Sequence, residues 1–161
     1  MNIFVLDTDP VKNAEYHNDT HTVKMILESA QLLMSSYHIT GSHAQGDDKL
    51  YKLTHKNHPC TKWVNESILN WDWLLQLTFE LNTQWKTRFN HNRDHLSVDK
   101  LNYIISRYGL PKLDCCGQTP FVQVMPDDIK CDDTVTAYRN YYIRGKRHIA
   151  SWRNSKPFWY K

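Results

Sequence analysis

The sequence contains no long apolar run, and this absence argues against one class of protein. No segment approaches the run of about 18 apolar residues that a membrane-spanning helix needs, so we expect no membrane partner. The first ten residues, MNIFVLDTDP, also lack the basic and then apolar layout of a secretory signal. These two absences together predict a protein of the cytoplasm.

Cysteine is scarce, and it follows no metal-binding pattern. The four cysteines, Cys60, Cys115, Cys116 and Cys131, include no CxxC pair, so a zinc ribbon is not expected. A disulfide framework is not expected either in a reducing compartment. His17 and His21 have the i,i+4 spacing of a metal-binding pair, but no third ligand stands out. We therefore predict neither a metal nor another cofactor.

The net charge is also small, at +3 for 161 residues, and does not by itself indicate a nucleic-acid partner. Its distribution is more informative, because residues 132–161 hold seven lysines and arginines against two aspartates. Tyrosines and tryptophans alternate with these cations, and such a pattern can attract phosphates and stack on bases. We expect a phosphate-binding surface here, formed by Arg139, Arg144, Lys146 and Arg147. A solvated helix whose aromatic side chains pack inward remains the alternative.

The length and the apolar spacing predict one compact domain, residues 1–161, that is mainly all-α, with about four helices and long irregular loops. Residues 2–6 form a short strand or an extended segment. Apolar residues at steps of three and four predict a long helix that ends before the loop at 41–48. It begins at Asp9-Pro10 or at Asn18-Asp19, since both offer a capping side chain. Further helices are predicted from Pro59 to about Phe89, over 97–108, and from about 132 to Trp152, before a terminal KPFWYK that packs back through its aromatic side chains.

The first long helix carries an unusual polar stripe in the segment HNDTHTVKMILESAQ, residues 17–31. On a helical wheel, the stripe lies opposite the apolar face that includes Val23, Ile26 and Leu27. Its members are His17, His21, Lys24, Glu28 and Gln31. These residue types transfer protons or bind anions, so the stripe is a candidate wall of an active site. The alternative is a solvated face with a weak Lys24–Glu28 pair.

A second polar cluster, THKNHPCTKW at residues 54–63, stands directly before a predicted helix. It places His55, Lys56, Asn57 and His58 beside Pro59, near the first helical position. The free N–H groups of a helix N-terminus attract anions, so this cluster would suit a phosphate. An ordinary capping loop is the alternative. We expect the loop and the polar stripe to meet at one pocket.

Three segments of the chain resemble a known family. They are DTHTVKMILESAQLL at 19–33, the long stretch 57–89 that follows an Asn-His step, and the aromatic and basic ending RNSKPFWYK. Together they are similar to the phage-type pyrimidine-dimer DNA glycosylases, also called endonuclease V. In this resemblance Glu28 matches the catalytic glutamate, and His58 matches a histidine before the second helix.

The resemblance implies an endonuclease V-like helical fold and a combined glycosylase and abasic-site lyase that acts on damaged or modified DNA. In that family the N-terminal α-amine attacks C1′ and forms an imine, and the glutamate assists. The family's nucleophile is a threonine that is exposed by removal of the first methionine, whereas this chain has Asn2 at that position, so the amine would belong to Met1. We expect Met1, Glu28, His21 and His58 to be the catalytic residues.

Two other functions stay open at this stage. A histidine pair and a lysine can cleave a phosphodiester without metal, with one histidine as base and the other as acid. The substrate would be a nucleic acid or a small cyclic nucleotide signal, which would suit a phage counter-defence protein in the cytoplasm of its host cell. The second alternative is a non-catalytic module that binds a nucleotide.

Overall fold

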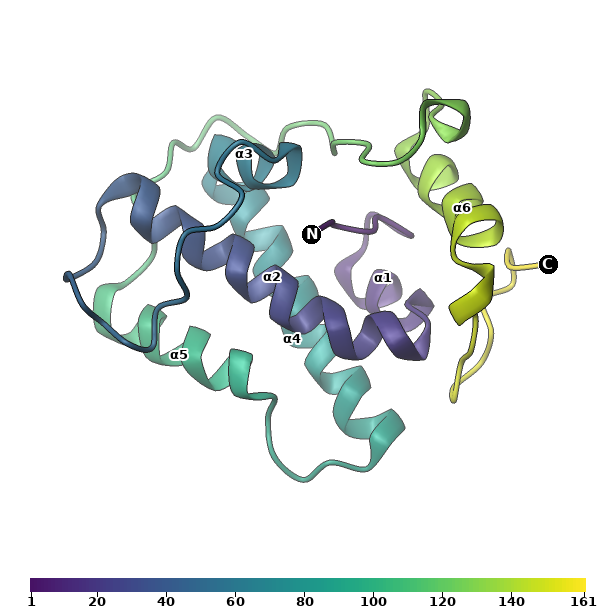
Figure 1. The fold of residues 1–161 in the computed structure, drawn as a ribbon, viewed down its shortest axis with the longest axis horizontal. Helices are drawn as coiled ribbons and strands as arrows, with labels where there is room; N and C mark the ends of the chain where they lie inside the picture. Colours follow the sequence, from purple (N-terminus) through teal and green to yellow (C-terminus); the bar gives the residue numbers. More distant parts are fainter.

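The computed structural model describes residues 1–161 and contains six α-helices and no strand, so the all-α prediction is confirmed (Figure 1). The number of helices is larger than the four or so that we predicted. The helices are α1 (Pro10–Tyr16), α2 (Asp19–Thr40), α3 (Pro59–Glu66), α4 (Ile68–Phe89), α5 (Leu96–Tyr108) and α6 (Thr134–Gly145). Short 3-10 turns cover Asp127–Ile129 and Arg147–Ile149. No helix is long and apolar enough to cross a membrane.

The two possible starts of the first helix are both used, so that one predicted helix is two. Asp9 caps α1 by accepting from the backbone N–H of Val11 at 2.9 Å. Asn18 caps α2 by accepting from the backbone N–H of His21 at 2.8 Å. The chain turns at His17, which has extended backbone angles. Each cap satisfies a donor that the start of a helix leaves without a partner.

The corner between α1 and α2 is closed by the guanidinium of Arg88, near the end of α4. The side chain of Arg88 is only 1% exposed. It donates to the carbonyl oxygens of Glu15 at 2.8 Å and of His17 at 2.7 Å. These carbonyls belong to the end of α1, where the helix supplies no partner of its own. Arg88 therefore fixes the direction in which α2 leaves the corner.

The helix predicted from Pro59 to Phe89 is also two helices. Ser67 adopts extended angles, with φ at −153° and ψ at 145°, and its hydroxyl accepts from the backbone N–H of Leu69 at 3.2 Å. The N–H of Ile68 donates instead to the carbonyl of Asp114 at 2.8 Å. The loop after α5 thus supplies the bond that a continuous helix would have made. The last helix also ends at Gly145 rather than at Trp152.

The long helices α2 and α4 cross at the centre of the molecule, with α3 and α5 on either side of them (Figure 1). Trp71 of α4 joins the pair by donating its indole N–H to the carbonyl of Leu33 at 3.1 Å. The core is one cluster, to which α2, α3, α4, α5 and α6 all contribute. The chain is accordingly a single compact unit.

The predicted faces of α2 are partly wrong. Val23 and Leu27, expected in the core, are 38% and 39% exposed, whereas His17 and His21, expected on the polar face opposite the core, are 1% and 4% exposed. The reason is the N-terminal segment, whose residues 3–6 are all buried although they form no strand. This segment lies between α2 and α6 (Figure 1). It covers the side of α2 that the helical wheel placed opposite the core.

The C-terminal aromatics pack back on the domain, as the sequence suggested. Trp159 makes edge contacts with Tyr16 and Tyr142, at ring-centroid distances of 5.7 and 6.3 Å. Trp152 donates its indole N–H to the carbonyl of Tyr16 at 3.0 Å. Phe158 is the exception, at 77% exposed. The ending of the chain thereby holds α1 and α6 together.

Candidate functional site

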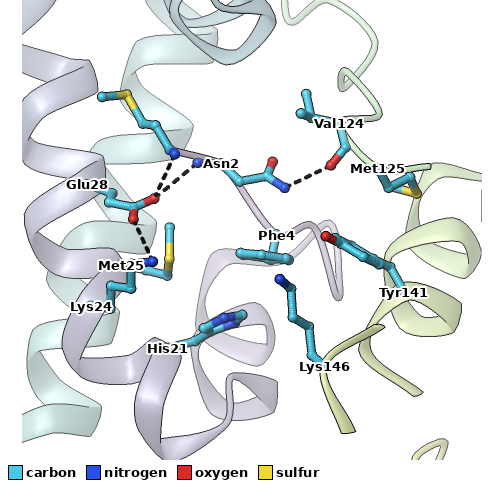
Figure 2. Close-up of a pocket in the computed structure, with 11 residues that line it drawn as sticks. Asn2, Phe4, His21, Lys24, Met25, Glu28, Val124, Met125, Tyr141 and Lys146 are labelled. Carbon is cyan, nitrogen blue, oxygen red and sulfur yellow. Dashed lines mark hydrogen bonds and ion pairs between the residues drawn. The ribbon is translucent and has the colours of Figure 1, made fainter. Parts of the chain in front are cut away.

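A pocket of about 430 Å³ opens between α2 and α6, with the N-terminal segment as its floor (Figure 2). One wall comes from α2, and the other from α6 and the loop before it. The lining residues are Met1, Asn2, Phe4, His21, Lys24, Met25, Glu28, Val124, Met125, Tyr141 and Lys146. Five of the predicted residues are therefore brought together: Met1, His21, Lys24, Glu28 and Lys146.

The carboxylate of Glu28 is the centre of the α2 wall. Its Oε2 atom accepts from the backbone N–H of Asn2 at 3.1 Å and lies 3.7 Å from the α-amine of Met1. Its Oε1 atom lies 3.3 Å from the ammonium group of Lys24. The Glu28 side chain is 14% exposed, so water still reaches it through the pocket. A carboxylate, a primary amine and a second cation thus share one partly desolvated site.

Asn2 holds the N-terminus in this position. Its side-chain N–H donates to the carbonyl of Val124 at 2.9 Å, and its side-chain oxygen accepts from the hydroxyl of Tyr138 at 3.2 Å. Burial raises the pKa of Tyr138, so its hydroxyl keeps the proton that it donates. Residue 2 therefore links α2, through its backbone, to α6 and the loop before it. Met1 is placed by this link together with its own contacts, since its amine pairs with Glu28 and its side chain packs against the core.

His21 forms part of the pocket wall but is itself nearly enclosed. Its ring stacks on Phe4, with centroids 4.4 Å apart and the planes at 28°. Its Nδ1 atom is hydrogen-bonded to the hydroxyl of the buried Tyr142 at 2.6 Å. Burial, with smaller contributions from nearby cations including Lys146 and Lys24, lowers the pKa of His21 to about 3. The imidazole is therefore neutral at physiological pH.

His17, predicted to bind substrate, lies behind the pocket and does not line it. Its Nδ1 atom is hydrogen-bonded to the carbonyl of Asn13 at 2.8 Å. Burial lowers the pKa of His17 to about 4. Its ring meets Phe4 edge-on, with centroids 6.4 Å apart. Gln31, further along α2, is half-buried and also lies outside the pocket.

The loop before α3 reaches the neighbourhood of the pocket without lining it. His58 caps α3, because its Nδ1 atom accepts from the N–H of Cys60 at 3.2 Å. Burial first, and then the positive charge of the Met1 amine, lower the pKa of His58, while the charge of Glu28 opposes this. His58 is thus within electrostatic range of the Met1–Glu28 pair. The other loop residues predicted to bind phosphate, His55, Lys56 and Asn57, are exposed and outside the pocket.

Of the four basic residues predicted to form a phosphate-binding surface, only Lys146 reaches the pocket. Arg139 donates to the carbonyl of Leu6 at 2.8 Å and pairs with Asp7 at 3.3 Å, so it secures the N-terminal segment. Arg144 pairs with Asp128 at 2.8 Å. Arg147 is exposed and outside the pocket. The aromatic residues between these cations pack mostly inward.

Several lining residues carried no sequence signal that singled them out. Asn2 and Phe4 lie in a short apolar run, Met25 is one of many apolar residues of α2, and the loop before α6 has no regular pattern. The lining residues without such a signal are Asn2, Phe4, Met25, Val124 and Met125. Tyr141 and Lys146 were part of the basic and aromatic tail but looked like their neighbours. Met1 and Glu28 were predicted from the resemblance alone, which implies an N-terminal amine beside a catalytic glutamate.

The side chains contain no group of three or more His, Cys, Asp or Glu residues placed to hold a metal ion. Comparisons with protein-family models, with curated proteins and with solved structures find no match. The pocket presents a primary amine, a carboxylate beside it, and cations on two opposite walls.

Proposed function

We propose that the protein is a DNA glycosylase and abasic-site lyase in which the α-amine of Met1 is the nucleophile and Glu28 the proton carrier. One observation carries the proposal: the amine lies 3.7 Å from the Glu28 carboxylate, inside an open pocket. A free α-amine has an ordinary pKa near 8, which leaves a useful neutral fraction at pH 7. Such an amine forms an imine with a sugar carbon when the two are held together.

The reaction would proceed in two steps. In the first, the nitrogen of Met1 bonds to C1′ while the bond from C1′ to the base breaks, and the base leaves with a proton. The C1′–O4′ bond of the sugar ring then opens, O4′ takes one proton from the Met1 nitrogen, and a C1′=N double bond forms. The resulting iminium ion acidifies the C2′ hydrogen. In the second step, Glu28 accepts the C2′ proton, a double bond forms between C2′ and C3′, and the 3′-phosphate leaves. Water then hydrolyses the imine and regenerates the amine.

The arrangement around Glu28 suits this role. Lys24 and the N–H of Asn2 hold the two carboxylate oxygens from different sides, so the group has little freedom to turn. A fixed carboxylate within reach of the substrate is what general acid–base catalysis requires, and it contributes about 10²–10⁴-fold in rate. Lys24 would also stabilise negative charge that develops on the leaving phosphate.

The phosphodiesterase alternative has less support from the geometry. It needs one histidine that is protonated and one that is neutral near pH 7. His21 has its pKa lowered to about 3 and is held by Phe4 and Tyr142. It is therefore neutral near pH 7 and cannot serve as the acid, and its Nδ1 atom is already hydrogen-bonded to Tyr142. The pocket would still suit the second alternative, a binding module for nucleotides.

Borohydride trapping tests the proposal directly. The protein is mixed with DNA that contains an abasic site, reduced with borohydride, and the adduct is mapped by mass spectrometry. We expect a covalent adduct on the Met1 amine. The absence of an adduct, or an adduct on Lys24 or Lys146 while Met1 stays free, would contradict the proposal.

A pair of substitutions separates chemistry from folding. Glu28→Gln should still bind abasic DNA but lower the strand-cleavage rate by about 10²–10⁴-fold. Glu80→Gln is the matched control, because Glu80 is a half-buried carboxylate of α4 outside the pocket. It should leave the rate unchanged. Equal strand-cleavage rates for the two variants would refute the enzymatic proposals and leave only the nucleotide-binding module.

A further inference from the structure

Two polar groups on the α6 wall of the pocket have no partner within the protein. Lys146 forms no ion pair, and the hydroxyl of Tyr141 forms no hydrogen bond, although both residues line the pocket (Figure 2). On the opposite wall, by contrast, the ammonium of Lys24 is paired with Glu28. The α6 wall therefore presents one uncompensated positive charge and one free hydroxyl, side by side.

The position of these two groups is built into the end of α6. A Cβ atom at Gly145 would lie 2.5 Å from Cε2 of Tyr141, so only glycine leaves room for the ring there. The Tyr141 ring is stacked beside Phe4, with centroids 6.1 Å apart and the planes at 24°. The ammonium of Lys146 lies 4.9 Å from the Tyr141 centroid and 5.9 Å from that of Phe4. Two aromatic faces thus hold the cation toward the pocket.

We propose that Lys146 and Tyr141 form a phosphate subsite for one DNA phosphodiester next to the sugar that reacts with Met1. The inference rests on the proposed function and adds the part of the substrate that the α6 wall recognises. An ammonium and a phenol are both donors to phosphate oxygens, and a charged donor makes the stronger bond. With Glu28 on the α2 wall and the Met1 amine beside it, the sugar would lie across the pocket, with its phosphate on α6.

The size of the pocket defines the substrate further. A volume of about 430 Å³ is in the range of small-ligand sites and suits one nucleotide unit rather than a stacked duplex. A nucleotide inside a duplex has to rotate out of the stack to enter such a site. The substrate class is therefore a DNA strand with one nucleotide turned outward, anchored by its own phosphate.

Binding can be measured without the reaction by using DNA that carries a tetrahydrofuran abasic analogue, which cannot form an imine. We expect Lys146→Gln to weaken binding of this DNA by about tenfold at low salt and to reduce the salt slope by about one. Tyr141→Phe should weaken binding by a smaller factor, since a neutral hydrogen bond is lost. Lys146→Arg should retain most of the affinity. Lys112→Gln is the matched control, because Lys112 is an exposed lysine outside the pocket, and it should change neither quantity.

The phosphate itself is tested with neutral methylphosphonate linkages placed singly on either side of the analogue. If Lys146 binds one of these phosphates, the Lys146→Gln variant and the unaltered protein should have equal affinities for DNA in which that one linkage is neutral. The subsite would be overturned if the Lys146→Gln substitution lowered affinity equally whichever linkage is neutral. It would also be overturned if the unaltered protein showed no detectable binding.

The outcome for the subsite is independent of the outcome for the chemistry. Lys146-dependent binding without a borohydride adduct would refute the lyase and keep the subsite. An adduct on Met1, together with a DNA affinity that the Lys146→Gln substitution does not change, would refute the subsite and keep the lyase.

Discussion

One added residue at the N-terminus should abolish the chemistry while leaving the fold intact. The change is a single glycine placed before Met1, produced by cleaving a removable N-terminal fusion. The nitrogen of Met1 then becomes an amide, which is not a nucleophile. The new amine is displaced along the chain by up to about 3.6 Å, the reach of one residue. The present amine is 3.7 Å from Glu28 Oε2, so this displacement is as large as the contact itself.

The expected loss follows from this distance. A misplacement of about 1 Å can cost a catalytic group 10²-fold, so a shift of several ångströms should lower the rate of imine formation at least that much. The cost in folding free energy should be small. One ion pair of a chain terminus is changed, but Glu28 keeps Lys24 and the N–H of Asn2, and the bonds made by the Asn2 side chain remain.

The assay is the initial rate of borohydride-trapped adduct on abasic DNA, measured together with the melting temperature. The matched control carries the extra glycine after Lys161 instead, and it should react at the unaltered rate. If the N-terminally extended protein reacts within a factor of three of the unaltered one, Met1 is not the nucleophile, and the interpretation of the α2 wall is wrong.

Three further predictions concern stability. Arg88→Met should lower the free energy of unfolding by about 3–5 kcal/mol in urea titrations, because Asp19 and the carbonyls of Glu15 and His17 lose a buried partner; a loss below 1 kcal/mol would mean that Arg88 does not fix the corner. Acid should destabilise the protein before any carboxylate with a lowered pKa titrates. The pKa values of His17 and His21 fall from 6.5 in the unfolded chain to about 4 and about 3 in the folded protein. Below pH 6.5 the unfolded state therefore binds more protons, and stability declines as the pH falls from there toward 4. Two such groups give a slope of up to about 2.7 kcal/mol per pH unit, which His17→Gln should roughly halve; an unchanged slope would show that His17 is not buried in its neutral form. Ser67→Ala should cost about 1 kcal/mol by removing the cap of α4, and a more stable variant in thermal unfolding would indicate that the break before Ile68 is not needed.

The helices were predictable where local signals decide them. The helix 97–108 was found within one residue of the observed Leu96–Tyr108, because an apolar period and a following Gly109 define both its ends. The break at Ser67 was not predictable in the same way. Its apolar pattern continues through the break, and the bond that replaces the helical one comes from Asp114, far along the chain.

The site was predictable to the extent that it lies on one helix. Lys24 and Glu28 are four residues apart on α2, so their pairing follows from helical geometry. His17 and His21 belong to the same stripe, yet they are buried, because the N-terminal segment and α6 cover them. A helical wheel shows which residues share a face but not what covers that face. Lys146 could be distinguished from Arg139 and Arg144 only by the carboxylates near the two arginines, which the fold supplies.

The N-terminal segment is made first and buried last. The hydrogen bonds that hold this segment join residues more than 120 positions apart in the sequence. The separations are 122 residues from Asn2 to Val124, 136 from Asn2 to Tyr138 and 133 from Leu6 to Arg139. A ribosome releases the first residues long before α6 exists, so the segment has nothing to pack against during most of synthesis. Contacts of such long range also close slowly. The amine and the carboxylate are therefore held in the pocket only once the whole chain has been made. A truncated product would carry the same reactive groups without a pocket around them.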